Sequence, residues 1–282
     1  MASPLSLITP LDPGEPGGTR RHALAAPVMQ QAACTTAFRR LEAAVASARG
    51  SRRDANQDAH SALHGQGRIF VVADGVGGGA MARMASAQLV LQLHRALDGP
   101  RLDEARIVRA MLQADREVAR CIAQASCAPG ASTVALCAPA NLLASRWWVA
   151  WVGDCRVYRL AQRGDRGIEL LTRDDTFAHL NETPPEGSSA DDPARMVGNG
   201  AMWGANVALH DLARGDLLAL CSDGVHKHLD DLDWERVLRQ PLPLARRCER
   251  LIALARRHGS ADDATVLLVH RGRPATAGEP LT

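Results

Sequence analysis

The chain has 282 residues, of which 46% are hydrophobic and only 3% aromatic, and its formal net charge is +2. This length fits one large domain or two small ones, and the apolar fraction is high enough to fill a core. Basic and acidic residues are interspersed, so there is no electrostatic footprint for nucleic acid or for an anionic membrane. No run approaches the roughly 20 apolar residues that a membrane span needs.

The cysteines and the start of the chain bear on its location. The seven cysteines form no Cys-x-x-Cys pair and no zinc-like spacing, and an odd number cannot all pair. A reducing compartment fits this usage. Prolines and glycines interrupt the first apolar residues, so no secretory apolar region is present. We therefore expect a cytoplasmic protein.

Small residues, proline and glycine dominate both ends of the chain. We expect residues 1–37 to form a flexible N-terminal tail and residues 272–282 a C-terminal tail. No repeat, heptad run or linker divides the remainder, which predicts a single domain over residues 38–271. Inside it, residues 174–208 contain three prolines and several glycines. This segment is predicted to be an irregular, variable flap.

The apolar spacing alternates between strand and helix periods along this domain. Strands are predicted at residues 41–47, 68–73, 133–137, 147–152, 155–160, 168–171, 216–221 and 266–270. Helices are predicted at residues 86–97, 103–122, 233–239 and 244–257, with Asp103 as the N-cap of the second. Short, closely spaced strands favour an antiparallel meander, and the amphipathic helices need a sheet to cover. The pattern indicates an α+β fold.

The stretch around Asp74 is the most informative in the chain. Five apolar residues run into Asp74 and Gly75, which predicts a buried strand that ends at this aspartate. A glycine at this point lets the backbone approach a ligand closely, so that its carbonyl can bind a cation. An ordinary Asp-Gly turn is the simpler alternative for this motif alone.

Other aspartates occupy similar positions. Four lie at the edge of an apolar strand and a fifth lies in a turn between strands: Asp58, Asp74, Asp223, Asp262 and Asp154. If their strands are neighbours, these carboxylates converge, and such a cluster is tolerable only if cations neutralise it. An all-oxygen ligand set favours Mg²⁺ or Mn²⁺ over zinc. Each aspartate alone fits a turn, but five coincidences together favour a metal centre.

Arg53 lies close to this set in the sequence. Its planar guanidinium can bind a phosphate through two hydrogen bonds. A solvated arginine beside Arg49 and Arg52 is the simpler interpretation of the spacing alone.

Six short motifs occur in a fixed order. They are Arg-Asp-Ala-Asn-Gln-Asp at 53–58, Val-Ala-Asp-Gly-Val-Gly-Gly at 72–78, Ala-Ser-Thr at 131–133, Gly-Asp-Cys-Arg at 153–156, Ser-Asp-Gly at 222–224 and Asp-Asp-Ala-Thr at 262–265. In this ordered set the chain resembles the metal-dependent PPM family of protein serine/threonine phosphatases, the protein phosphatase 2C-like group, in its compact bacterial form. The resemblance covers residues 41–269.

The resemblance implies a fold and a site. The fold is a four-layer α-β-β-α sandwich, with two mainly antiparallel sheets flanked by helices. Asp74 would bridge two metal ions, and the Gly75 carbonyl would bind one of them. The roles of the remaining site residues follow: Asp223 and Asp262 would complete the other ion's ligands, Asp58 would orient water, Arg53 would hold the phosphate and Asp154 would help to bind a third, weaker ion.

The resemblance also implies an activity. The protein would use Mn²⁺ or Mg²⁺ and a metal-activated water to hydrolyse phosphoserine and phosphothreonine in a protein substrate, opposing a bacterial Ser/Thr kinase. We expect a monomer. A non-catalytic phosphoprotein-binding module on the same fold is the alternative. A phosphatase that acts on a small phosphorylated molecule is a third hypothesis.

Several departures from the family pattern motivate the alternatives. Gln57 stands where many members have glutamate, and the Asp-Asp-Thr at 174–176 lacks the histidine often found there. His179 lies nearby, but a lone histidine is more often solvated than catalytic. Cys155 replaces a serine and is interpreted as a small, partly buried thiol rather than a redox centre. Asp263 replaces an asparagine, which either strengthens cation binding or alters a turn.

Overall fold

The computed structural model describes residues 26–36, 39–63, 68–97, 99, 102–162 and 167–271. All strand pairings within its two sheets are antiparallel. The first sheet has the order β1-β2-β11-β10-β7-β8, formed by β1 (Val28–Thr36), β2 (Arg39–Ala48), β11 (Ala264–Arg271), β10 (Leu217–Cys221), β7 (Arg156–Leu160) and β8 (Ile168–Leu170). The second has the order β3-β4-β5-β6-β9, formed by β3 (Ala59–His60), β4 (Phe70–Val76), β5 (Ala131–Pro139), β6 (Arg146–Val152) and β9 (Asn206–Asp211).

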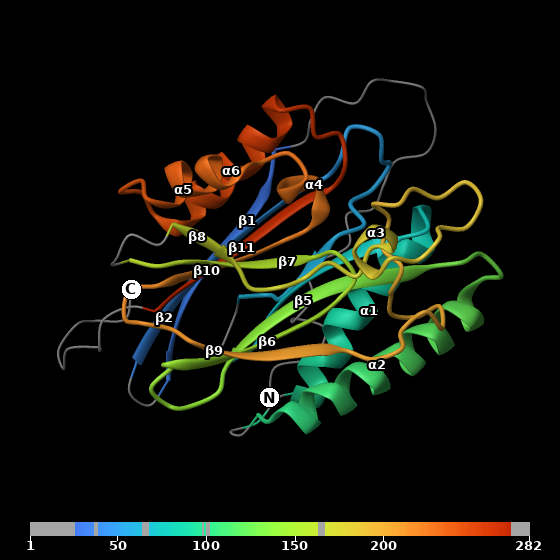
Figure 1. Cartoon of the computed structure of the whole chain (residues 1–282), viewed down its shortest axis with the longest axis horizontal. Helices are drawn as coiled ribbons and strands as arrows, with labels where there is room; N and C mark the ends of the chain where they lie inside the picture. Colours follow the sequence, from blue (N-terminus) through green and yellow to red (C-terminus); the bar gives the residue numbers. More distant parts are fainter. Residues whose placement is uncertain are drawn as a thin grey trace.

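Helices cover the outer face of each sheet (Figure 1). The five-stranded sheet carries α1 (Gly79–Leu97) and α2 (Glu104–Ala125), and the six-stranded sheet carries α5 (Asp231–Leu238) and α6 (Leu244–Arg257). Two short helices, α3 (Phe177–Leu180) and α4 (Asp223–His226), lie at one end of the sheets. The predicted α-β-β-α sandwich is confirmed.

Three apolar cores hold these four layers together. One lies between the two sheets and contains Trp147 and Leu218, both fully buried. The other two lie between a sheet and its helix pair and include Met111 of α2 and Trp234 of α5. Truncating a fully buried leucine such as Leu218 to alanine costs about 2–5 kcal/mol in similar cores. Because both faces of each sheet are covered, the central strands are apolar on both sides.

The helix predictions hold well because their signals are local. The Asp103 carboxylate accepts the Arg106 backbone N–H at 2.7 Å, which confirms the predicted N-cap of α2. Helix α6 has the predicted bounds. Helix α1 begins at Gly79, earlier than its apolar stripe indicated, since the Gly-rich turn after β4 leads directly into its first turn.

Three strand predictions need correction. Residues 28–36, assigned to the tail, form β1, which pairs with β2 from Val28 opposite Ser47 to Thr36 opposite Arg39. Tertiary pairing rather than a hydrophobic pattern makes this segment a strand. Edge strand β9 was missed because residues 206–211 begin inside the predicted flap, whose broken sequence hides them. Strand β4 continues past Asp74 to Val76, so Asp74 lies in the ladder, opposite Thr133. The rest of the predicted tails, residues 1–25 and 272–282, lies outside the described residues.

The antiparallel register gathers the motif-bearing loops at one end of the sandwich. In the six-stranded sheet, Cys221 at the end of β10 pairs with Val266 near the start of β11 and with Arg156 at the start of β7. The loops that follow β2, β6 and β10 and precede β11 therefore meet at that end. The carboxyl end of β4 reaches the same place from the other sheet.

Candidate active site

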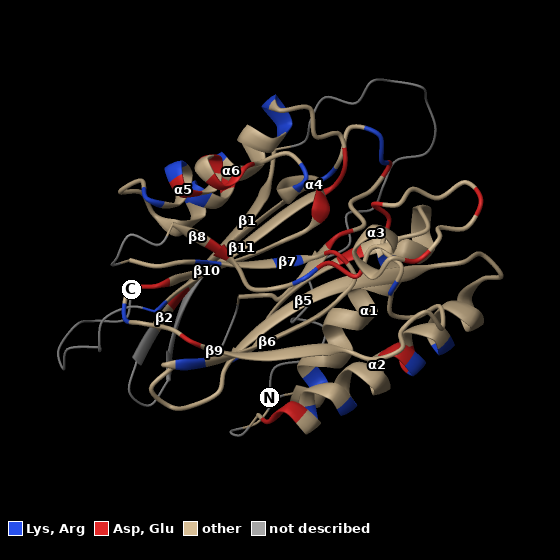
Figure 2. Cartoon of the chain, in the orientation of Figure 1, with Lys and Arg blue, Asp and Glu red and all other residues tan. Residues whose placement is uncertain are grey.

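The five predicted aspartates come together at this end of the two sheets. Each belongs to a different segment: Asp58 precedes β3, Asp74 lies in β4, Asp154 lies in the β6–β7 turn, Asp223 begins α4 and Asp262 precedes β11. Figure 2 shows acidic residues gathered near α3 and α4, where the two sheets meet. The sequence prediction that these carboxylates converge is supported by their mutual electrostatic effects.

Asp74 is the electrostatic centre of the cluster. Burial raises its pKa well above the ordinary value, and the charges of four other aspartates raise it further: Asp223, Asp58, Asp154 and Asp262. No described cation forms an ion pair with its carboxylate. An acid in such surroundings ionises readily only beside a positive charge.

Asp58 is fixed by two hydroxyl groups. The Ser222 and Thr265 hydroxyls each donate to its Oδ2 atom at 2.7 Å. Its Oδ1 atom is buried and has no hydrogen-bond partner among the described residues. Burial, followed by the charge of Asp263, raises the pKa of Asp58 to about 8, against the opposing effect of the two hydroxyls. Thus one oxygen is oriented and the other is left for a ligand.

Asp262 and Arg53 form a paired unit at one side of the cluster. The Arg53 guanidinium donates through Nε to Asp262 Oδ1 at 2.9 Å and through Nη2 to Oδ2 at 3.2 Å. Burial by itself would raise the pKa of Asp262, but hydrogen bonds from Arg53 and from the Asp263 N–H bring it below the ordinary value. Arg53 is therefore not the solvated surface arginine of the simpler interpretation.

Lys227 pairs with two other members of the cluster and was missed by the sequence analysis. Its Nζ atom lies 2.8 Å from Asp223 Oδ2 and 3.2 Å from Asp154 Oδ2. Burial and the charge of Asp223 raise the pKa of Asp154 to about 6, while Lys227 opposes this rise. The signal available in the sequence was the four-residue spacing between Asp223 and Lys227 on a helix.

Two glycines allow the loops of the site to pack closely. A Cβ atom on Gly75 would lie 2.4 Å from the Ala82 carbonyl oxygen, and one on Gly224 would lie 1.9 Å from the Asp263 carbonyl oxygen. Only glycine permits such contacts between backbones. Gly75 therefore has a packing reason to be glycine in addition to the ligand role expected for its carbonyl.

Asp263 anchors the loop that carries Arg53 and Asp58. Its two carboxylate oxygens accept the backbone N–H groups of Gly50 at 2.7 Å and Gln57 at 2.8 Å. The residue is buried. Of the two roles open for Asp263, the structure favours the local structural one.

The residues fit a hard divalent cation in their chemistry. The donor set consists of carboxylate oxygens, Asp58 has an unpartnered buried oxygen, and the carboxylates raise the pKa of Asp74 together. Among the described residues, no three acidic, histidine or cysteine side chains are arranged as a ready ligand set. Three of the acids instead contact Arg53 or Lys227. A cation would bind best at the Asp58 and Asp74 side of the cluster.

The base of the flap is held by two buried aspartates. Asp174 forms an ion pair with Arg156 at 2.7 Å, and Asp175 accepts the Gly153 N–H at 3.0 Å. The first contact ties the flap to the start of β7, and the second ties it to the turn that contains Asp154. His179 is exposed, and its Nδ1 atom lies 2.8 Å from the Thr176 hydroxyl. These contacts give the Asp-Asp-Thr segment a structural role.

Cys155 is a buried thiol, more deeply buried than the partly buried thiol that the sequence indicated. It is 1% exposed and lies 3.2 Å from the Thr133 hydroxyl. Burial and the nearby aspartates raise its pKa well above the ordinary value, so the reactive thiolate is suppressed.

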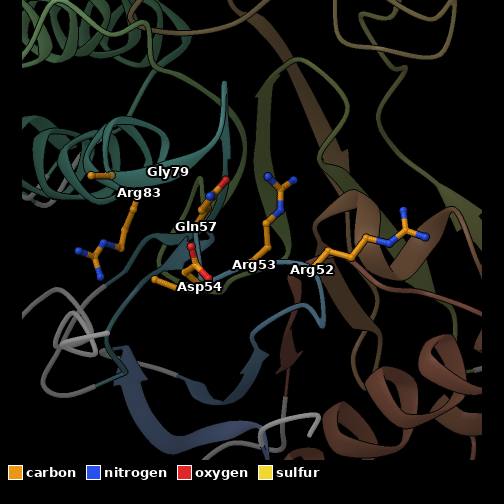
Figure 3. Close-up of a pocket in the computed structure, with 8 residues that line it drawn as sticks. Arg52, Arg53, Asp54, Gln57, Gly79 and Arg83 are labelled. Carbon is orange, nitrogen blue, oxygen red and sulfur yellow. The ribbon is translucent and has the colours of Figure 1, made fainter. Parts of the chain in front are cut away.

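A basic hollow of about 300 Å³ lies beside the acidic cluster. Figure 3 shows Arg53 between Arg52 and Gln57, with Arg83 beyond Gln57. The remaining lining residues are Asp54, Ala55, Gly79 and Ala80. The first turn of α1, to which Gly79 and Ala80 belong, contains no acidic residue, and the three arginines outnumber Asp54. Such a surface favours an anionic group.

The comparisons with known proteins identify the family. The protein phosphatase 2C model matches residues 47–259. The chain is 30% identical over 239 residues to the serine/threonine protein phosphatase PstP of Mycobacterium tuberculosis, an alignment that covers 81% of the chain but 44% of the relative's length. The chain belongs to the protein phosphatase 2C family, as the motifs indicated.

Solved structures agree with this assignment. The catalytic domain of PstP in complex with two manganese ions is 27% identical, with a TM-score of 0.69, over 82% of this chain and 98% of that one. PppA of Pseudomonas aeruginosa, described as a key regulatory component of T6SS, is 26% identical, with a TM-score of 0.69, over 83% and 98%. In the described part of this chain, every helix is too short or too polar to cross a membrane.

Proposed function

We propose that the chain is a metal-dependent phosphatase that hydrolyses phosphoserine and phosphothreonine in protein substrates and opposes a bacterial Ser/Thr kinase. The observation that carries this proposal is the meeting of five aspartates from five segments, with Arg53 at their side. The family, and the manganese in the PstP catalytic domain, support it. We also propose that the protein is a monomer in the cytoplasm. Six described cysteines are free thiols, which fits a reducing compartment.

The residues fit a centre of two Mn²⁺ or Mg²⁺ ions. Asp74 would hold both ions, the Gly75 carbonyl one of them, and Asp223 and Asp262 would complete the other. When bound, the ions would supply positive charge that offsets the phosphate and makes water a stronger nucleophile at neutral pH. Because Ser222 and Thr265 fix one oxygen of Asp58, its other oxygen is left to orient the attacking water and take its proton.

Arg53 would bind the phosphate. The Arg53 guanidinium has five N–H donors, and two of its nitrogens donate to Asp262. The remaining donors are left for phosphate oxygens. Asp262 also fixes the plane of the guanidinium. The basic hollow next to Arg53 gives an anionic substrate a place to enter.

Phosphate release from a phosphothreonine peptide tests the proposal. Turnover is expected with Mn²⁺ and none with a chelator. A chain that binds the peptide without turnover, in either condition, would be the non-catalytic module. Faster hydrolysis of small phosphate esters than of the peptide would favour the small-molecule phosphatase instead.

A further inference from the structure

The chain contains a single lysine, Lys227, and its other 32 basic residues are arginines. That lysine lies in the acidic cluster of the site. Arginine presents a planar fork that suits one carboxylate, whereas an ammonium group is a compact charge with three donors in different directions. The chain's single lysine therefore lies between two carboxylates, at the position where a compact ammonium fits better than a planar guanidinium.

The geometry of Lys227 resembles that of a bound cation. Its Nζ atom contacts one oxygen of Asp223 at 2.8 Å and one oxygen of Asp154 at 3.2 Å. The Asp154 side chain is only 3% exposed, so water cannot solvate its charge. A buried carboxylate of this kind requires a positive partner, either a side chain or an ion.

The fold holds Lys227 in this place. Helix α4 begins at Asp223, and Lys227 follows one turn later at its C-cap, on the same face. The last residue of α4, His226, donates from Nε2 to the Asp154 backbone oxygen at 2.9 Å, which fixes α4 against the turn. Gly224 allows the helix to pack directly against the Asp263 carbonyl. The ammonium is thus positioned by the backbone as well as by its partners.

We propose that the Lys227 ammonium is a resident cation that takes the place of a metal ion between Asp154 and Asp223. The proposed centre then holds ions beside Asp74 and Asp58, and the third ion expected at Asp154 does not bind. Asp223 uses one oxygen for Lys227 and keeps the other for an ion beside Asp74. This inference rests on the proposed metal-dependent function, because it concerns how many ions that centre accepts.

Counting Mn²⁺ ions per full-length chain tests this inference without reference to turnover. Native mass spectrometry gives the number of ions, and the electron paramagnetic resonance signal of free Mn²⁺ gives their affinities. The variants are Lys227→Met, Asp154→Asn and the two combined. Arg246→Met is the matched control, because it removes one positive charge from an ion pair on α6, with Glu249 at 2.7 Å.

The expected result is two ions in the wild type, in Asp154→Asn and in the control. Lys227→Met should accept one more ion, bound at least about tenfold more tightly than any third ion of the wild type, and the double variant should return to two. An unchanged ion number in folded Lys227→Met would overturn the inference. So would a wild-type third ion that Asp154→Asn removes, which decides the matter even if Lys227→Met does not fold. A wild type that binds no Mn²⁺ would overturn the metal centre itself, and this inference with it.

Discussion

The two sides of the acidic cluster differ in how their charge is balanced. On one side, Asp154 and Asp223 contact Lys227, and Asp262 contacts Arg53. On the other side, Asp58 has two hydroxyl partners, and neither it nor Asp74 forms an ion pair with a described cation. On the first side, side-chain cations already pair with the carboxylates. On the second side, burial and neighbouring charges raise the pKa of both aspartates and so disfavour their ionisation. The need for an external cation is therefore concentrated at Asp58 and Asp74.

Replacing the central carboxylate should have the largest effect. Asp74→Asn removes the charge that is proposed to hold both ions, and we expect Mn²⁺-dependent phosphopeptide hydrolysis to fall by at least about 100-fold. In the metal-free state the same variant should be at least as stable as the wild type, because one of several mutually repelling carboxylates is gone. Phosphate release and thermal unfolding measure the two effects. Wild-type turnover in this variant would refute the role of Asp74.

The pH dependence of stability should reveal the carboxylate of Asp58, on the side without a paired cation. The pKa of Asp58 in the folded chain, about 8, lies above its value in an unfolded chain. The folded state therefore retains the proton longer, and this contribution to the free energy of unfolding is lost as pH rises from about 4 to about 8. For the metal-free chain we expect a loss of roughly a few kcal/mol relative to Asp58→Asn. Urea unfolding at several pH values measures it, and saturating Mn²⁺ should reverse the trend.

Asp263 should matter for stability more than for chemistry. Asp263→Ala leaves the buried N–H groups of Gly50 and Gln57 without their acceptors, at an expected cost of about 2–4 kcal/mol in the free energy of unfolding. Asp263→Asn retains one acceptor and should lose roughly half as much. Urea denaturation compares the three chains. Equal stability of Asp263→Ala and the wild type would mean that this anchor is unimportant.

Replacing Arg53 by lysine tests whether the shape of the cation beside Asp262 matters, because the charge is unchanged. Arg53→Lys keeps the positive charge beside Asp262 but loses the planar fork, and we expect about a tenfold fall in kcat/KM for the phosphopeptide. Arg52→Lys is the matched control, because Arg52 lines the same hollow without a described ion pair to the aspartates. Equal losses in both variants would point to general electrostatics instead of phosphate binding by Arg53.

Cys155→Ser should have the smallest effect. The buried thiol already lies at hydrogen-bond distance from Thr133, and a hydroxyl can occupy the same place. We expect a stability change of no more than about 1 kcal/mol and turnover within about twofold of the wild type. Mild peroxide should leave the wild type active if Cys155 is inert. Inactivation that the serine variant prevents would assign a redox role to this residue.

The sequence predicted most of the fold and most of the candidate site because both depend on local signals. The apolar spacing of α6 and the cap at Asp103 define their helices without help from distant residues. The aspartates at strand edges could be recognised because strand ends are visible in the sequence. Their convergence followed from the motif order rather than from any single motif.

The missed features depend on tertiary contacts. Strand β1 is a strand because β2 pairs with it, and its small and polar residues carry little pattern of their own. Asp263 and Lys227 acquire their roles from backbone N–H groups and carboxylates contributed by other segments. Both partners of Asp263 and the Asp154 partner of Lys227 are far away in the sequence, and only Asp223 lies within one helical turn of Lys227.

The most direct test of the metal centre is a crystal structure of the chain with Mn²⁺, with anomalous scattering used to locate the ions. We predict two anomalous peaks at the carboxylate of Asp74, with Asp58 nearby, and none between Asp154 and Asp223, where Lys227 lies. The absence of a peak at Asp74 under saturating Mn²⁺ would contradict the proposed metal-dependent chemistry.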